Sequence, residues 1–319
     1  MGFLSAMKAN KAHRLQQQGK REEAMKLYEE SFAEGLNNPR FLLAYALLII
    51  RDGQYQKARE FLVAHQKVPM SPGQRTELLV YYATCCFRLG NLDKGINVLE
   101  QQFRKGETGL LYQTLGYLYV EKYDMDHRPD FAAMEAEAAE EVSRTAGDAE
   151  QTGNESGETP EEESAAEENP AETAPASEND AEENTSEGTP DAENTQEEEA
   201  PKLSPEEEWN AGIEKAEAFI RESVEYDDED PVCLDNLGEF LYRVHGDKAG
   251  AKVYFDKAIA LKENQIDTLY FLSRYDLEAG DKKAALEKLE KAAAGRFSPL
   301  NYCDREKITK EIEELKGAL

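Results

Sequence analysis

The sequence has few cysteines, and they form no metal-binding pattern. The four are Cys85, Cys86, Cys233 and Cys303. No C-x-x-C pair occurs, and no two histidines stand at the spacing of zinc ligands. We therefore expect reduced, partly buried thiols, no bound metal and no other cofactor.

Catalytic motifs are also missing. The sequence has no Gly-rich phosphate loop, no nucleophile elbow and no H-E-x-x-H pair. Its four histidines, His13, His65, His127 and His245, fall on different predicted helices and loops. We therefore expect no enzymatic activity.

Long apolar runs are absent as well. The longest, Phe41 to Ile50, is about half the length of a membrane-spanning helix. The N-terminal stretch MGFLSAM lacks a basic signal-peptide region, and Ala6 stands where myristoylation requires Ser or Thr. We expect a cytoplasmic protein without membrane insertion. Two alternatives stay open for the apolar start, which can rest on a membrane surface or pair with a second copy of the chain.

Dense basic clusters are lacking too, so nucleic acid is not an expected partner, because binding requires cations to replace the counterions of the phosphate backbone. The net charge is −29. Residues 129–208 hold 28 of the acidic residues and only two basic ones, Arg144 and Lys202. The rest of the chain is nearly neutral, so the acidity belongs to one segment.

That segment has the composition of a disordered insert. Residues 144–203 contain no aromatic residue and few branched apolar ones, so they cannot bury enough surface to offset the entropy of ordering. Its C-terminal edge differs, because Ser204, Pro205 and Glu207 have the spacing of a capping box and predict a helix that begins near Pro205.

Outside the insert the sequence repeats. A glycine is followed five residues later by a small residue, and successive glycines lie 34, 37 and, later in the chain, 34 residues apart. Apolar residues recur at helical spacing on both sides of each glycine, which indicates two antiparallel helices joined by a tight turn. The pairs are Gly19 with Ala24, Gly53 with Ala58, Gly90 with Gly95, Gly246 with Ala251, and Gly280 with Ala285.

The fourth hairpin is interrupted. Its turn is expected at Tyr123, but the acidic insert follows instead of a second helix. If the insert is passed over, Ala216 takes the small position and Ile220 the bulky position of a delayed second helix. At the C-terminus, Ile308 and Ile312 belong to one apolar stripe of a helix that we interpret as the cap of the array. The predicted first helices are residues 4–18, 39–52, 74–89, 109–122, 231–244 and 265–279.

These features resemble the bacterial-type tetratricopeptide repeat. The similarity is greatest in NLGEFLYRVHGDKAGAKVYFDKAIALK, with Leu237, Gly238 and Ala251, and in YQTLGYLY, with Leu115 and Gly116. The first and third units depart from the Leu-Gly pattern. The resemblance implies an all-α fold, an α-solenoid of about six hairpins with a capping helix. Its parts are N-terminal hairpins in residues 1–128, the insert in 129–203, and C-terminal hairpins with the cap in 204–319.

In this family the first helices line a concave peptide-binding face, and helical phase assigns nine residues to it here. Arg51 and Arg88 occupy equivalent places, two before a turn glycine, and with the other arginines of the set they predict a channel that favours anions. The alternative is that their stems pack on neighbours and their heads are solvated. The nine are His13, Arg51, Tyr81, Arg88, Tyr117, Asn236, Arg243, Tyr270 and Arg274.

Three functions are compatible with the sequence. The first is a non-catalytic scaffold that binds a peptide or helix of another protein. The second is a regulated binder whose acidic insert competes for the groove, and the third treats the insert as a solubilising spacer. The two-carboxylate clamp of heat-shock co-chaperones is absent, since Ala9, Ala44 and Glu77 occupy three of its places. The partner protein and the oligomeric state stay open.

Overall fold

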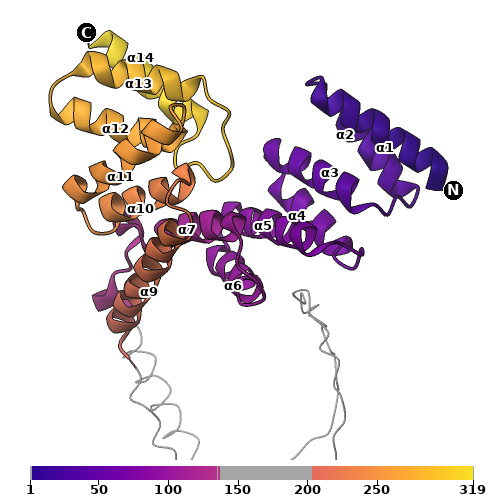
Figure 1. Ribbon diagram of the computed structural model, residues 1–319, viewed down its shortest axis with the longest axis horizontal. Coiled ribbons are helices and arrows are strands. Elements are labelled where there is room, and N and C mark those ends of the chain that lie inside the picture. Colours follow the sequence, from indigo (N-terminus) through magenta and orange to yellow (C-terminus); the bar gives the residue numbers. More distant parts are fainter. Residues whose placement is uncertain (1, 135, 137–202, 319) are drawn as a thin grey trace, which may run out of the picture. The chain divides into compact units, whose positions relative to one another are not determined.

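The computed structural model describes residues 2–134, 136 and 203–318. By their contacts these residues fall into two units, one made of Met1–Arg128 with Gly212–Leu319 and the other of Pro129–Ala211. Helices are the only regular elements in the described ranges (Figure 1). The predicted disordered segment lies almost wholly outside the described residues.

The larger unit is a series of helical hairpins, and the six predicted first helices are confirmed to within about two residues. Each is followed by a second helix, and a short 3-10 turn, Met125–His127, follows the fourth first helix. The first helices are α1 (Gly2–Gln17), α3 (Pro39–Arg51), α5 (Pro72–Arg88), α7 (Gly109–Tyr123), α10 (Pro231–Arg243) and α12 (Ile266–Glu278). The second helices are α2 (Arg21–Ala33), α4 (Tyr55–Ala64), α6 (Leu92–Phe103), α9 (Pro205–Tyr226), α11 (Lys248–Leu261) and α13 (Lys282–Ala293), and α14 (Arg305–Gly317) ends the chain.

Local sequence fixes where three of the first helices, α3, α5 and α10, begin. Asn38, Ser71 and Asp230 each accept a hydrogen bond from a backbone N–H of the first turn, and a proline follows each of them at the first helical position. A proline there loses no helical hydrogen bond and has a suitable φ angle, so the pair of residues sets the helix start.

The turn glycines take the left-handed conformation that ends each first helix, with φ between 66° and 81° at Gly19, Gly53, Gly90, Gly246 and Gly280. The small residue five positions later is explained by close helix packing. At Gly95 an added Cβ atom would lie only 3.0 Å from the carbonyl oxygen of Ala83 on the preceding helix. The sequence spacing therefore records the turn and the helix contact together.

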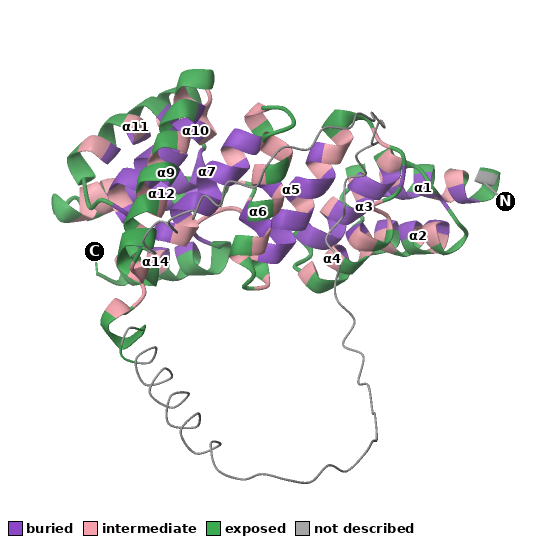
Figure 2. Cartoon of the chain, turned by 90° about the horizontal axis from the view of Figure 1, so that it is seen from below, coloured by how far each residue is buried: buried purple, intermediate pink, exposed green. Residues whose placement is uncertain are grey.

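The core of the unit runs along the interface between the helices. The alanines at the small positions of α2, α4, α11 and α13 are fully buried. Large side chains fill the spaces between them, among them Tyr28, Phe240 and Phe255. Figure 2 shows the buried residues following α3, α5 and α7 along the array. Burial of these apolar side chains is the main stabilising contribution to such a stacked fold.

The interrupted hairpin is completed by α9, as predicted. Ser204 and Glu207 form the capping box, in which the Ser204 N–H donates to Glu207 Oε2 at 2.8 Å. Ala216 and Ile220 are both fully buried. Phe219 packs on the Tyr112 ring of α7 with centroids 5.3 Å apart. The second helix of the fourth hairpin is thus delayed by the insert and still pairs with α7.

At the C-terminal end, α14 packs on α13 through Ile308 and Ile312, which are 0% and 8% exposed. This confirms the predicted apolar stripe of the terminal helix. All four cysteines are unpaired and buried, also as expected. None of the helices in the described ranges combines the length and hydrophobicity needed to cross a bilayer.

Candidate peptide-binding groove

The first helices of hairpins two to six share the wall of one cavity of about 510 Å³, which we call the central cavity. Leu47 of α3, Val80 of α5, Tyr117 of α7, Asn236 of α10 and Asp267 of α12 represent the five helices. The loop that follows α13 closes one side with residues 296 and 298–301. The cavity is therefore built by one face of the repeat array.

The wall of the central cavity combines apolar and hydrogen-bonding groups. Leu47, Ile50 and Val80 contribute apolar surface, and Asn236 and Gln113 contribute amides. The Asn236 side chain is already ordered, because its Nδ2 donates to the Gln113 carbonyl oxygen at 2.9 Å. An apolar wall with a few fixed polar groups is the usual composition of a site for a peptide or small ligand.

A second cavity, of about 360 Å³, shares Ile50, Arg296 and Asn301 with the central cavity. We call it the arginine pocket, because five arginines contribute to its lining. Tyr55 and Phe297 add aromatic surface, and the Arg88 guanidinium lies 5.7 Å from the Tyr55 ring centroid. The arginines are Arg21, Arg51, Arg88, Arg296 and Arg305.

These five guanidinium groups lack partner carboxylates. Among the described residues no Asp or Glu forms an ion pair with any of them, although Asp304 contributes to the lining. Partial desolvation, together with the nearby Arg296 and Arg21, lowers the pKa of Arg51. Positive charge that the protein leaves uncompensated in a concave site attracts an anion and strengthens its hydrogen bonds.

Five of the nine residues assigned to the concave face from sequence line these two cavities. Tyr81, Tyr117 and Asn236 line the central cavity, and Arg51 and Arg88 line the arginine pocket. Tyr117 and Asn236 are only 4% and 2% exposed, so they form the floor of the cavity. The other four, His13, Arg243, Tyr270 and Arg274, line neither cavity.

Three of these four are covered by the C-terminal segment. The centroid of the Tyr302 ring lies 4.1 Å from Cζ of the Arg243 guanidinium. Glu311 of α14 pairs with Arg274 and accepts a hydrogen bond from the Tyr270 hydroxyl at 3.3 Å. His13 is half-buried near the end of the array and lies beside the Tyr28 hydroxyl. The loop after α13 and the capping helix therefore occupy the groove side of the last two hairpins.

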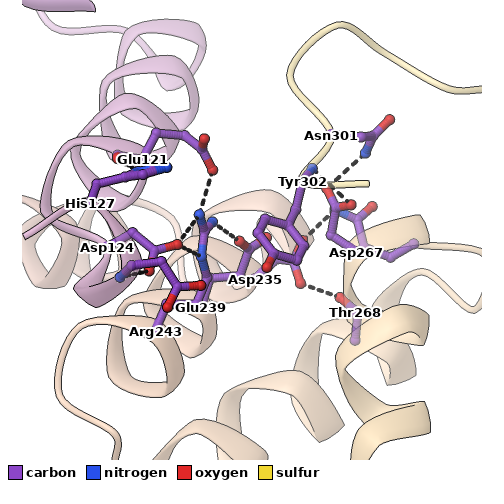
Figure 3. A network of polar contacts seen from close by, with 12 residues as sticks. Glu121, Asp124, His127, Asp235, Glu239, Arg243, Asp267, Thr268, Asn301 and Tyr302 are labelled. Atoms are coloured by element: carbon purple, nitrogen blue, oxygen red, sulfur yellow. Dashed lines mark hydrogen bonds and ion pairs between the residues drawn. The ribbon is translucent and has the colours of Figure 1, made fainter. Parts of the chain in front are cut away.

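Arg243 is the centre of a buried ionic network between α7 and α10 (Figure 3). Its guanidinium donates to Asp124 Oδ2 through Nε at 2.8 Å and through Nη2 at 2.6 Å. It also donates to Glu121 Oε1 at 2.7 Å and to Glu239 Oε2 at 2.8 Å. The arginine is 7% exposed, so the network is shielded from solvent.

Next to this network lie three buried carboxylates, Asp235, Glu239 and Asp267, which we call the carboxylate cluster (Figure 3). Each offers an oxygen within 4.8 Å of the others, and none is more than 3% exposed. Burial raises the pKa of Asp235 to about 6, and burial together with the charge of Asp235 raises the pKa of Asp267 to about 7. Arg243 pairs with Glu239, but among the described residues no cationic side chain forms an ion pair with Asp235 or Asp267.

The sequence did not indicate either the cluster or the full arginine pocket. Asp235 and Glu239 are four residues apart on one apolar helix, which was the one visible signal of buried acids. Their partner Asp267 lies on a different hairpin. Arg21, Arg296 and Arg305 come from the first hairpin and from beyond the last, and no repeat position relates them to Arg51.

A family model and several solved structures are similar to this chain. The family model described as "Anaphase-promoting complex, cyclosome, subunit 3" matches residues 17–102, a stretch that includes α2 to α5 and all but the last residue of α6. A thermophilic TPR protein from Thermus thermophilus shows 12% identity and a TM-score of 0.50, over 88% of this chain and 99% of its own. A tetratricopeptide repeat protein from Parabacteroides merdae shows 11% identity and a TM-score of 0.43, over 98% of both chains. No curated protein matches the sequence.

Proposed function

Because this chain has the fold of the tetratricopeptide-repeat proteins, we propose that it is a non-catalytic scaffold whose groove binds an extended acidic segment of a partner protein. The observation that carries this proposal is the arginine pocket. Five guanidinium groups surround about 360 Å³ without a paired carboxylate among the described residues. The adjoining central cavity offers apolar wall for the side chains that flank the acidic group.

The energetics favour a charged ligand at this place. An arginine presents several N–H donors in a planar fork that matches a carboxylate, and a charge-assisted hydrogen bond contributes about 1.5–3 kcal/mol. Tyr55 and Phe297 supply rigid contact area beside the guanidinium groups.

A crosslinking experiment tests the proposal in the full chain. The photoreactive residue p-benzoylphenylalanine replaces Tyr55, which lines the arginine pocket, or Tyr254 of α11, which lines neither cavity. We expect the probe at position 55, and not at 254, to crosslink an Asp- and Glu-rich segment of a partner, and an excess of hexaglutamate peptide to block the reaction. Equal crosslinking of the same proteins from both positions, insensitive to the peptide, would refute the proposed groove.

The acidic insert is the basis of a second proposal, that it competes with the partner for the arginine pocket. The charges are complementary, because residues 129–208 hold 28 acidic residues and the pocket holds five arginines. A tethered competitor acts at an effective concentration on the order of millimolar. Crosslinking of residue 55 to the chain's own insert would support this second proposal.

Exchange of the insert measures this competition directly. We expect replacement of residues 137–202 by an uncharged Gly/Ser chain of equal length to raise the affinity for labelled hexaglutamate by about tenfold at low salt. A control insert with the same composition in scrambled order keeps its charge and is expected to compete like the wild type. If all three chains bind the peptide equally, the insert is a spacer and does not regulate the groove. Fluorescence anisotropy at two salt concentrations gives the affinities.

A further inference from the structure

We propose that the carboxylate cluster of Asp235, Glu239 and Asp267 binds one hard divalent cation, of the class of Ca²⁺, Mg²⁺ and Mn²⁺. The ligands are three carboxylate oxygens within 4.8 Å of one another. In a site with oxygen ligands about 2.1–2.5 Å from the ion, neighbouring ligands lie about 3 Å apart and opposite ligands about 4–5 Å apart. The spacing of the cluster falls inside this range.

Rigid elements hold the three carboxylates in place. Asp235 and Glu239 are one helical turn apart on α10, and Asp267 lies in the first turn of α12. An all-oxygen, all-carboxylate set of ligands favours hard cations over zinc or copper, which prefer nitrogen and sulfur. The chemistry of the donors thus defines the class of ion.

An unpartnered oxygen gives the site a second, independent indication. Glu239 is 1% exposed, and its Oε2 accepts the hydrogen bond from Arg243. Its other oxygen, Oε1, is buried and has no hydrogen-bond donor. A buried carboxylate oxygen without a partner is costly, so a ligand is expected to satisfy it. A cation between Glu239 and the two aspartates meets this need.

Outer hydrogen bonds orient the other two carboxylates, as is usual for metal ligands. Asp235 accepts from the Thr268 hydroxyl and the Gln265 amide, and Asp267 accepts from the Asn301 amide at 2.7 Å and from the Tyr302 N–H at 3.1 Å. These donors leave lone pairs on the carboxylate oxygens for an ion.

The central cavity gives the ion a route and room for water. Asp235 and Asp267 both line this cavity of about 510 Å³. Hard cations in proteins usually keep several water ligands, so three protein ligands at the edge of a cavity are sufficient. The cluster is therefore accessible even though its side chains are buried.

The charge balance points in the same direction. Arg243 is within hydrogen-bonding distance of Glu121, Asp124 and Glu239, so it cannot also compensate both buried aspartates. Lys262 acts on Asp235 at a distance, but its side chain is exposed. Buried negative charge without compensation is strongly unfavourable. A divalent cation supplies two positive charges and joins α10 to α12 beside the groove.

Thermal unfolding tests this assignment. The full chain is first treated with a chelator and then titrated separately with Ca²⁺, Mg²⁺ and Mn²⁺. At about 100 times the Kd of the preferred ion we expect Tm to rise by roughly 5–10 °C. The rise is expected to disappear in Asp267→Asn and Glu239→Gln, since an amide is a weaker ligand without charge. Asp228→Asn removes an exposed carboxylate that does not belong to the cluster and is expected to respond like the wild type.

Two results would overturn the assignment. If no ion raises the Tm of the wild-type chain, the cluster is neutralised by protons and holds no metal. If the rise persists undiminished in Asp267→Asn, the ion binds elsewhere, for example to the acidic insert. Far-UV circular dichroism shows whether each variant is folded before titration, and Glu239→Gln gives a second reading if Asp267→Asn is not.

Discussion

Replacement of Arg243 by methionine is expected to lower the free energy of unfolding by about 3–5 kcal/mol. Arg243 donates four hydrogen bonds to Glu121, Asp124 and Glu239, all within 2.8 Å. Methionine fills similar space but leaves these carboxylates buried without a positive partner. The loss of the Tyr302 contact with the guanidinium adds to the cost. Urea unfolding followed by far-UV circular dichroism measures the change.

Two further variants test whether the effect depends on the shape of the guanidinium group and on the burial of the ion pairs. Arg243→Lys keeps the positive charge but loses the planar fork, so its destabilisation is expected to lie between those of the wild type and methionine. Arg221→Ala removes an exposed i, i+4 pair with Glu217 and is expected to change the free energy by less than about 0.5 kcal/mol. If Arg243→Met destabilises no more than Arg221→Ala, the buried network does not hold α7 and α10 together.

The fold was predictable because its information is local. Each uninterrupted hairpin has a turn glycine at positive φ and, five positions later, a small residue at the close helix contact, as Gly90 and Gly95 show. These requirements recur at a nearly fixed period, so several weak signals agree. Counting the same repeat spacing across the insert located Ala216 and Ile220 in the delayed helix, and both are fully buried.

The lining of the two cavities was predictable only in part, because helical phase cannot show what else covers a helix. Phase alone put Arg51 and Arg88 on the inner face, and the structure has them in the arginine pocket. The same reasoning put Arg243 and Arg274 there, where Tyr302 and Glu311 of the C-terminal segment now cover them. That segment follows the last repeat, so no repeat position describes its path.

The carboxylate cluster illustrates the other limit of sequence reasoning. Acidic residues on a helix are usually solvated, and only the packing of α10 between α7 and α12 buries Asp235 and Glu239. Asp267 joins them because its hairpin stacks next in the array, which no local pattern specifies. The proposed sites thus depend on contacts between repeats, whereas the repeat signature reports contacts within them.

Reversal of two charges in the arginine pocket, Arg51→Glu with Arg88→Glu, is expected to weaken binding of labelled hexaglutamate at least tenfold at low salt. Two favourable charge-assisted contacts are lost, and two repulsive ones replace them, which together exceeds the roughly 1.4 kcal/mol that corresponds to a factor of ten. Both residues are exposed and lack carboxylate partners among the described residues, so the fold is expected to survive.

The control for this variant is Lys105→Glu with Lys283→Glu, which changes the net charge equally at exposed positions outside both cavities. A general electrostatic effect would weaken binding of the peptide equally in both double variants. A specific pocket would weaken binding only in the Arg51→Glu, Arg88→Glu variant. Raising the salt concentration screens exposed charges, so the difference between wild type and the pocket variant is expected to narrow. Equal losses in the two variants at every salt concentration would show that the arginines act through net charge, and the pocket would no longer explain recognition of an acidic partner.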